Sequence, residues 1–182
     1  SGTGSKFTPD NKWFLNELRN HIDKYDLKNI ADLGCGDWKI MENFIFNPTE
    51  NYTGIDCVEF LIKELELTHF HNSNIKFIYQ DIENNIPIGY DIVIIKDVIQ
   101  HWTDETINEF FPKLLANNKY VYCINGYKFT RDPTKNNWID RTLDKKYHFH
   151  PITIEKKPLD KFKKYIVDIK HRRSKQYILF SI

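Results

Sequence analysis

Two glycines stand one residue apart directly after a short apolar run, at Gly34 and Gly36. Ile30, Ala31 and Leu33 suit a buried strand, and a residue without a Cβ atom lets a ligand lie against the backbone of the following turn. Asp56 comes 20 residues after Gly36. A carboxylate at about this separation accepts hydrogen bonds from the two hydroxyls of a ribose in nucleotide-binding folds. These residues favour a nucleoside site, and the alternative for Asp56 is an exposed loop carboxylate.

A carboxylate and an imidazole, Asp97 and His101, follow residues 90–96, the most apolar run in the chain. If the loop is helical, their spacing of four residues places them on one face. A carboxylate beside a histidine sets the tautomer of the ring and raises its basicity, so His101 would be able to remove a hydroxyl proton. The alternative is that Asp97 caps a helix or contacts a cofactor, and that His101 only packs with Trp102.

Segments of strand character alternate with segments of helical periodicity, which predicts an α/β domain with parallel strands. Thr8 and Pro9 predict a helix start, because Thr is a favourable N-cap and Pro fits the first helical position. The carboxyl ends of parallel strands meet at one edge of the sheet, where ligands bind. We expect helices from Pro9 and at 38–46, 58–70 and 103–115, and strands at 30–33, 51–57, 75–79, 90–96, 119–124, 165–170 and 176–182, with Asn125-Gly126 as a turn.

Length and composition are those of one globular domain. We expect a single domain over residues 6–182, with residues 1–5 a cloning remnant rather than a targeting peptide. Since no apolar stretch approaches the roughly 20 residues that span a bilayer, we expect a soluble protein without a membrane partner. Cys35, Cys57 and Cys123 lack the spacing of a zinc or redox site and are predicted to be reduced, buried thiols in a cytoplasmic protein.

Positive charge is concentrated towards the end of the chain. Residues 145–175 contain eleven Lys and Arg against three acidic residues, so this segment carries +8 and the rest of the chain −7. Such a segment favours an anionic partner. The many Lys, Asn and Ile residues also fit an AT-rich genome, in which Lys accumulates without a function.

The motifs and their order resemble the class I S-adenosylmethionine-dependent methyltransferases. The matching runs are Asp-Leu-Gly-Cys-Gly at 32–36, Gly-Ile-Asp at 54–56, Gln-Asp-Ile at 80–82 and Lys-Asp-Val-Ile-Gln-His-Trp at 96–102. The resemblance implies a Rossmann-like seven-stranded, mostly parallel sheet with a C-terminal antiparallel hairpin and helices on both faces. Trp38 stands where the first motif of the family often has a third glycine.

The resemblance also implies S-adenosylmethionine as the cofactor. By this reading Gly34 and Gly36 let the methionyl part and the ribose approach the turn, Asp32 orients the ammonium group, and Asp56 holds the ribose. The implied cofactor-binding residues, with Asp81 and Ile82 at the adenine, are Asp32, Gly34, Cys35, Gly36, Asp56, Cys57, Asp81, Ile82 and Asp97.

The sulfonium is already an activated methyl donor, so the remaining tasks are alignment of the acceptor and proton removal, which we assign to His101 with Asp97. The later segments resemble a subgroup of methyltransferases associated with glycan or secondary-metabolite modification. That resemblance implies O-methylation of a hydroxyl on a sugar, glycan or other small molecule, with nucleotide-sugars among the candidate acceptors. The expected acceptor contacts come from Trp102 and from an aromatic, basic segment after Asn125, through Tyr127, Arg131, Arg141 and His148.

Two other functions stay open. The basic C-terminal segment would suit methylation of RNA or protein. A methyltransferase-like scaffold without catalysis is the second alternative. Oxygen ligands are too sparse around the candidate residues to favour a metal ion. The sequence leaves the oligomeric state open.

Overall fold

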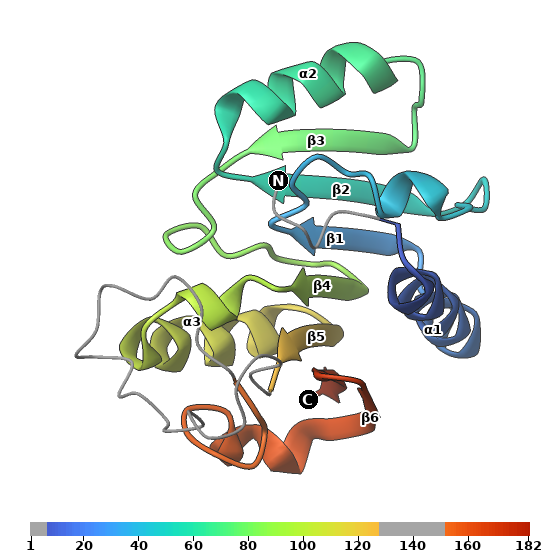
Figure 1. Ribbon diagram of the computed structural model, residues 1–182. Coiled ribbons are helices and arrows are strands. Elements are labelled where there is room, and N and C mark those ends of the chain that lie inside the picture. The colour runs from blue at the N-terminus through green and yellow to red at the C-terminus, as the bar shows by residue number, and fades with distance from the viewer. Residues whose placement is uncertain (1–6, 128–151) are drawn as a thin grey trace. The chain divides into compact units, whose positions relative to one another are not determined.

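A computed structural model describes residues 7–127 and 152–182 of the chain (Figure 1). Seven strands form a mixed sheet in the order β3-β2-β1-β4-β5-β7-β6, which confirms the predicted fold class. The chain divides into two compact units. The first comprises the described residues up to Asn85 with Tyr90–Val93, and the second comprises Ile86–Gly89 and the described residues from Ile94 onwards.

The first unit consists of three parallel strands and two helices. Ala31 of β1 lies opposite Thr53 of β2, and Gly54 of β2 lies opposite Phe77 of β3. The three strands run in the same direction, so their carboxyl ends lie at one edge (Figure 1). In chain order the elements are α1 (Pro9–Tyr25), β1 (Asn29–Leu33), the 3-10 helix η2 (Met41–Asn43), β2 (Asn51–Asp56), α2 (Glu59–His69) and β3 (Ile75–Tyr79).

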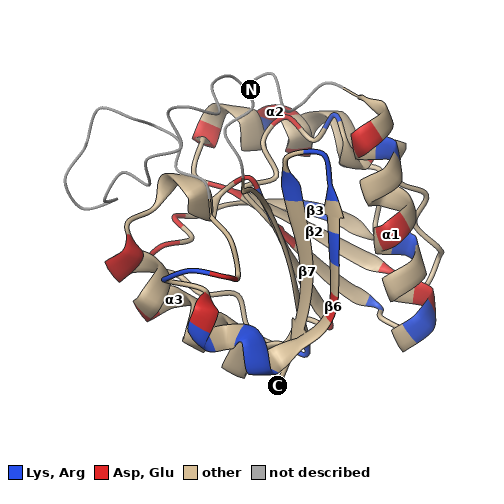
Figure 2. Cartoon of the chain, turned by 60° about the horizontal axis from the view of Figure 1, so that its bottom comes forward, with Lys and Arg blue, Asp and Glu red and all other residues tan. Residues whose placement is uncertain are grey.

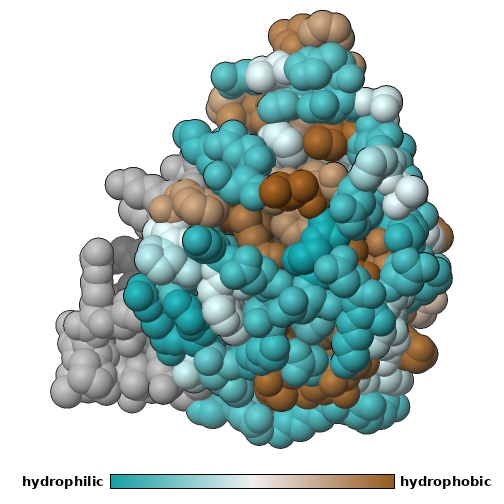
Figure 3. Space-filling view, turned by 90° about the vertical axis from the view of Figure 1, so that its right-hand side faces the viewer, coloured by the Kyte–Doolittle hydropathy of each residue, from teal (hydrophilic) through white to brown (hydrophobic). Residues whose placement is uncertain are grey.

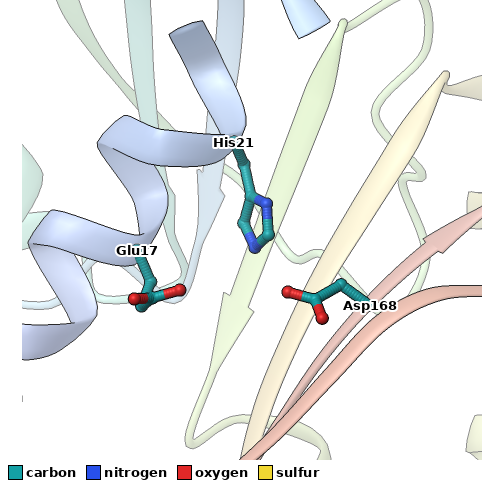
Figure 4. Close-up of side chains that lie close together, drawn as sticks. All are labelled: Glu17, His21 and Asp168. Carbon is teal, nitrogen blue, oxygen red and sulfur yellow. The ribbon is translucent and has the colours of Figure 1, made fainter. Parts of the chain in front are cut away.

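Helix α1 begins as the sequence predicts. The Thr8 hydroxyl oxygen accepts a hydrogen bond from the Asn11 backbone N–H at 3.3 Å, and Pro9 occupies the first turn. Phe14, Leu18 and Ile22 are buried on its apolar face. The helix also buries Glu17 and His21, which are one turn apart on the same helix (Figure 4). The buried face of α1 is therefore only partly apolar.

The predicted helix over residues 38–46 is wrong, because the segment forms only η2, a three-residue 3-10 helix. Trp38 has a φ of 58°, in the left-handed region that interrupts a right-handed helix. Its indole is buried in an aromatic cluster, with ring centroids 4.5 Å from His69 and 5.4 Å from Phe77. Packing of this side chain outweighs the local helix propensity.

The second unit is built around antiparallel strands. The predicted terminal hairpin is confirmed: β6 pairs antiparallel with β7, and β7 pairs antiparallel with β5. The predicted turn at Asn125-Gly126 is wrong, because both residues continue β5 and lie opposite Gln176 and Lys175. The elements are β4 (Ile92–Lys96), which begins in the first unit, the 3-10 helix η3 (Ile99–His101), α3 (Asp104–Asn117), β5 (Tyr120–Gly126), the 3-10 helix η5 (Asp160–Tyr165), β6 (Ile166–Arg172) and β7 (Lys175–Ser181).

The outer surface of α2 carries apolar side chains. Leu67 and Phe70 are 77% and 83% exposed and line a shallow hollow with Lys63 and Glu66. Figure 3 shows one face of the molecule, which is mostly hydrophilic and carries separate groups of hydrophobic residues, coloured brown.

Within residues 7–127 and 152–182, every helix is too short or too polar to cross a bilayer.

A buried ion pair joins α1 to the segment before β2. The Glu50 side chain is 1% exposed, and its two oxygens accept hydrogen bonds from the Arg19 guanidinium at 2.7 and 3.0 Å. The Asn47 backbone N–H and side-chain amide donate to the same carboxylate at 3.0 and 2.8 Å. Arg19 also lies over the Phe44 ring, 4.5 Å from its centroid. This pair therefore connects the first helix with the segment that carries the aromatic cluster.

Replacement of Arg19 by Met leaves the buried Glu50 carboxylate without its cationic partner. We expect Arg19→Met to lower the free energy of unfolding by about 3 kcal/mol, measured by urea denaturation. Arg19 also pairs with the exposed Asp23, so Asp23→Asn is the control and should change the stability by less than about 0.5 kcal/mol. Equal effects of the two substitutions would contradict a dominant role for Glu50.

Acid should weaken the same interaction. Burial alone would raise the pKa of Glu50, but the hydrogen bonds from Arg19 and Asn47 outweigh it and the pKa lies below its ordinary value. The stabilisation is therefore present above the unfolded-state pKa of about 4.3 and is lost as the pH falls through the lower folded-state pKa. We expect Glu50→Gln to flatten this part of the curve of stability against pH, measured by urea denaturation at successive pH values.

Candidate functional site

The glycine turn after β1 is bound to the end of β2. Gly34 and Gly36 have φ values of 72° and 57°, a region that residues with a side chain rarely adopt. The Ile55 carbonyl accepts hydrogen bonds from the Gly34 and Cys35 N–H groups at 2.8 and 3.2 Å. The turn therefore has a defined conformation at the carboxyl edge of the parallel strands.

Asp56 connects the same turn to the start of α2. One carboxylate oxygen accepts from the Gly36 N–H at 2.9 Å, and the other accepts from the Val58 N–H at 3.0 Å. Asp56 is only 8% exposed, so the alternative that it is an exposed loop carboxylate is wrong. Each carboxylate oxygen has a second lone pair. The carboxylate can thus hold the turn and still accept further hydrogen bonds.

Gly54 is a part of this arrangement to which sequence reasoning assigned no role. A Cβ atom at this position would lie 2.7 Å from Phe77 Cδ1 and 3.0 Å from Cys35 Sγ. Both distances are shorter than ordinary van der Waals contact, so a side chain here would displace the Phe77 ring or the turn at Cys35. A glycine inside a strand is a signal of such close approach.

Asp32 is buried at the end of β1, with 6% exposure. Its carboxylate accepts a hydrogen bond from the Tyr52 hydroxyl at 2.8 Å. Burial, with the negative charge of Asp32 beside it, raises the pKa of Tyr52 well above its ordinary value, so the hydroxyl stays a donor. Asp32 is therefore held in position within the first unit, and its contact with a cofactor ammonium stays a prediction.

The residues after β3 have mixed environments. Asp81 is exposed, and its carboxylate accepts from the Glu83 N–H at 3.1 Å and the Asn84 side-chain amide at 2.7 Å. Ile82 is buried. The Asp81 carboxylate thus stabilises a turn, and adenine recognition by Asp81 and Ile82 stays a prediction.

The predicted burial of all three thiols is wrong. Cys57 is exposed, Cys35 is partly exposed, and Cys123 is buried. Burial raises the pKa of Cys123 to about 12, and burial together with the nearby Asp56 carboxylate raises the pKa of Cys57. These thiols stay protonated near neutral pH, which argues against nucleophilic catalysis by a thiolate.

In the second unit, Asp97 follows β4 in a left-handed conformation, with a φ of 61°. Its N–H donates to the Ile124 carbonyl at 2.8 Å. One carboxylate oxygen, Oδ2, accepts from Lys96 Nζ at 2.7 Å and also from Lys175 Nζ. Burial would raise the pKa of Asp97, but the charges of the two lysines outweigh it and lower the pKa. Asp97 is therefore a carboxylate shared by two ammonium groups.

His101 ends η3, whereas Asp97 lies before this short helix. The helical spacing that predicted a shared face for Asp97 and His101 therefore does not apply. The His101 side chain is exposed, and Trp102 is buried with its ring centroid 4.9 Å from Phe110. The role of His101 as a base stays a prediction.

The predicted acceptor contacts fall in two classes. Tyr127 is described: its hydroxyl donates to the Arg173 carbonyl at 3.4 Å, and its ring centroid lies 5.3 Å from His171. Arg131, Arg141 and His148 lie outside the described residues. Lys175 contacts Asp97 because the pairing of β7 with β5 brings it to this position. In the sequence it stands out only as part of the basic C-terminal segment.

Several solved structures have the same architecture. The methyltransferase domain of bacterial CtHen1-CN superposes with a TM-score of 0.69 and 15% identity, over 94% of this chain and 99% of that chain. Magnesium protoporphyrin IX methyltransferase (ChlM) from Synechocystis PCC 6803, solved with bound SAH, gives 0.68 and 14%, over 93% and 82%. Mitomycin 7-O-methyltransferase MmcR gives 0.65 and 14%, over 86% of this chain and 50% of that chain. This chain has the methyltransferase fold.

Identities this low establish the fold and no more. The chain spans about half the length of MmcR but nearly all of the CtHen1-CN domain. Comparison of the sequence with protein-family models and with curated proteins finds no match.

The hydrogen bonds of Asp56 predict a local effect on the glycine turn. Asp56→Ala removes the acceptors of the Gly36 and Val58 N–H groups, so we expect both amides to exchange with solvent deuterium about tenfold faster. Hydrogen exchange followed by NMR would measure this. Asp81→Ala is the control and should leave the Gly36 amide unchanged, since the Asp81 hydrogen bonds are confined to its own turn. Unchanged exchange at Gly36 in Asp56→Ala would show that the carboxylate does not hold the turn.

Proposed function

We propose that this protein is an S-adenosylmethionine-dependent methyltransferase. The observation that carries the proposal is the bond between the Asp56 carboxylate and the Gly36 N–H of a turn with two left-handed glycines. The carboxylate therefore lies beside partly exposed backbone at the carboxyl edge of the parallel strands, where folds of this type bind ligands. The methyltransferase names of the similar structures, one of them with bound SAH, support the same function.

The cofactor residues that we propose lie within the first unit. Gly34 and Gly36 offer backbone without Cβ atoms, Asp56 has free lone pairs for the ribose hydroxyls, and Asp32 is a buried carboxylate for the ammonium group. Cys35, Cys57, Asp81 and Ile82 complete the proposed contacts in this unit. When bound, the cofactor supplies a methyl group on a positively charged sulfur.

For the acceptor we propose a hydroxyl of a sugar, glycan or other small molecule. MmcR, which is named a 7-O-methyltransferase, is consistent with a small-molecule hydroxyl as acceptor. The exposed His101 carries an imidazole, a side chain that commonly removes protons from hydroxyl groups in enzymes. Trp102, Tyr127, Arg131, Arg141 and His148 remain our proposed acceptor contacts.

Cofactor binding is the first test. We expect titration calorimetry to show saturable binding of S-adenosylmethionine and of its demethylated product. Asp56→Asn should weaken both by about tenfold or more, because a carboxylate accepts hydrogen bonds more strongly than an amide. Asp23→Asn on the exposed side of α1 is the matched control. A folded wild-type protein that binds neither compound would favour the scaffold alternative and overturn the proposal.

The proposed base has a separate test. A panel of nucleotide-sugars, glycans and RNA, incubated with labelled donor, would identify the acceptor by the mass of an added methyl group. With that acceptor, His101→Ala should lower turnover by about a hundredfold and leave cofactor affinity unchanged. Full turnover in His101→Ala would assign the histidine to another role.

A further inference from the structure

A cluster of charged side chains in the second unit has more positive than negative charge. It consists of Lys96 at the end of β4, Asp97 directly after it, and Lys175 at the start of β7, and we call it the Lys96–Asp97–Lys175 cluster. Two backbone contacts bring these residues together. The Asp97 N–H is bound to the Ile124 carbonyl of β5, and Lys175 lies opposite Gly126 in the β5–β7 ladder.

Both ammonium groups contact the same carboxylate oxygen, Asp97 Oδ2. The side chains of Lys96, Asp97 and Lys175 are only 12%, 23% and 26% exposed, so water screens the charges poorly. Two cations sharing one anion leave a formal charge of +1. Burial lowers the pKa of Lys175, and the Lys96 charge adds to this effect while Asp97 opposes it.

The surrounding chain adds to the positive charge. Arg172 lies opposite Lys175 across the β6–β7 ladder, and Arg173 follows in the turn. Figure 2 shows basic positions at this end of the hairpin. Each lysine ammonium has three N–H donors. The bond to Asp97 uses one donor of each lysine, so the partly exposed groups can each donate to a further acceptor.

The backbone at Asp97 is also unusual. A left-handed φ is unfavourable for a residue with a side chain and persists where its surroundings require it. Here it places the carboxylate on the two lysines at the carboxyl end of β4, which is the edge at which ligands bind in parallel sheets. The carboxylate thus holds two flexible cationic side chains in one place.

We propose that the Lys96–Asp97–Lys175 cluster binds an anionic oxygen group, a phosphate or carboxylate, carried by the methyl acceptor. This inference rests on the proposed function and narrows its acceptor to an acidic or phosphorylated small molecule. Asp97 is then a positioning residue for the lysines, and Lys175 and Lys96 donate hydrogen bonds to the anion. The methionyl carboxylate of the cofactor has the same chemistry and is the competing source of the anionic group.

Inorganic phosphate is the probe for the site. We expect an NMR titration of the wild-type protein at constant ionic strength to show saturable phosphate binding, and Lys175→Met to weaken it at least about tenfold. Lys175→Arg should retain binding, because it keeps the charge and the donors. Lys163→Met is the control, since Lys163 is exposed and paired with Glu155. Equal phosphate binding by wild type and Lys175→Met, or equal losses in Lys175→Met and Lys163→Met, would overturn the proposal.

Calorimetry with S-adenosylmethionine separates the two sources of the anion. If Lys175→Met loses phosphate binding but keeps a cofactor affinity within about twofold of wild type, the result supports an anion on the acceptor. A tenfold loss of cofactor affinity, with competition between phosphate and cofactor, would assign the cluster to the cofactor carboxylate and overturn the acceptor proposal. A third result is that phosphate binding depends on Lys175 while the wild-type protein binds no cofactor. That result would support an anion site at the cluster but refute the methyltransferase function, and with it an anion carried by a methyl acceptor.

Discussion

The hydrogen bond from the Gly36 N–H to the Asp56 carboxylate is the contact on which the first unit's candidate site depends. It joins the turn after β1 to the end of β2. The second oxygen of the same carboxylate accepts a hydrogen bond from the N–H of Val58, the residue directly before α2. The Ile55 carbonyl of β2 accepts hydrogen bonds from two further N–H groups of the turn, so β2 contributes three of the contacts that define the turn's conformation. A ligand would therefore meet a turn that is already formed, which reduces the entropy lost on binding.

Close packing below the turn supports this arrangement. Gly54 lets the Phe77 ring and Cys35 approach the strand, and Trp38 packs against the same Phe77 ring. The side chain of Trp38, two residues after Gly36, leaves the turn and enters the aromatic cluster with Tyr52 and His69. The Arg19–Glu50 pair, next to that cluster, connects it to α1.

The second unit changes the interpretation of Asp97. From sequence spacing it was a partner for His101, whereas in the structure its carboxylate is shared by Lys96 and Lys175. Both lysine contacts are made to the same oxygen, Oδ2, and the pairing of Asp97 with His101 stays a prediction. We therefore propose two separate roles. The exposed imidazole of His101 would remove the proton, and the Lys96–Asp97–Lys175 cluster would bind the acceptor.

The order of strands and helices, the capped start of α1, the glycine turn and the terminal hairpin were all determined by sequence, because each depends on local periodicity, glycine or capping residues. Residues 38–46 and Asn125-Gly126 were mispredicted, since burial of Trp38 and pairing with β7 override local propensity. Only the tertiary structure decided which side chains meet. Lys175 lies 78 residues from Asp97 in the chain, and the antiparallel pairing of β7 with β5 brings the two residues together. This long-range contact cannot be inferred from the residue types near either position.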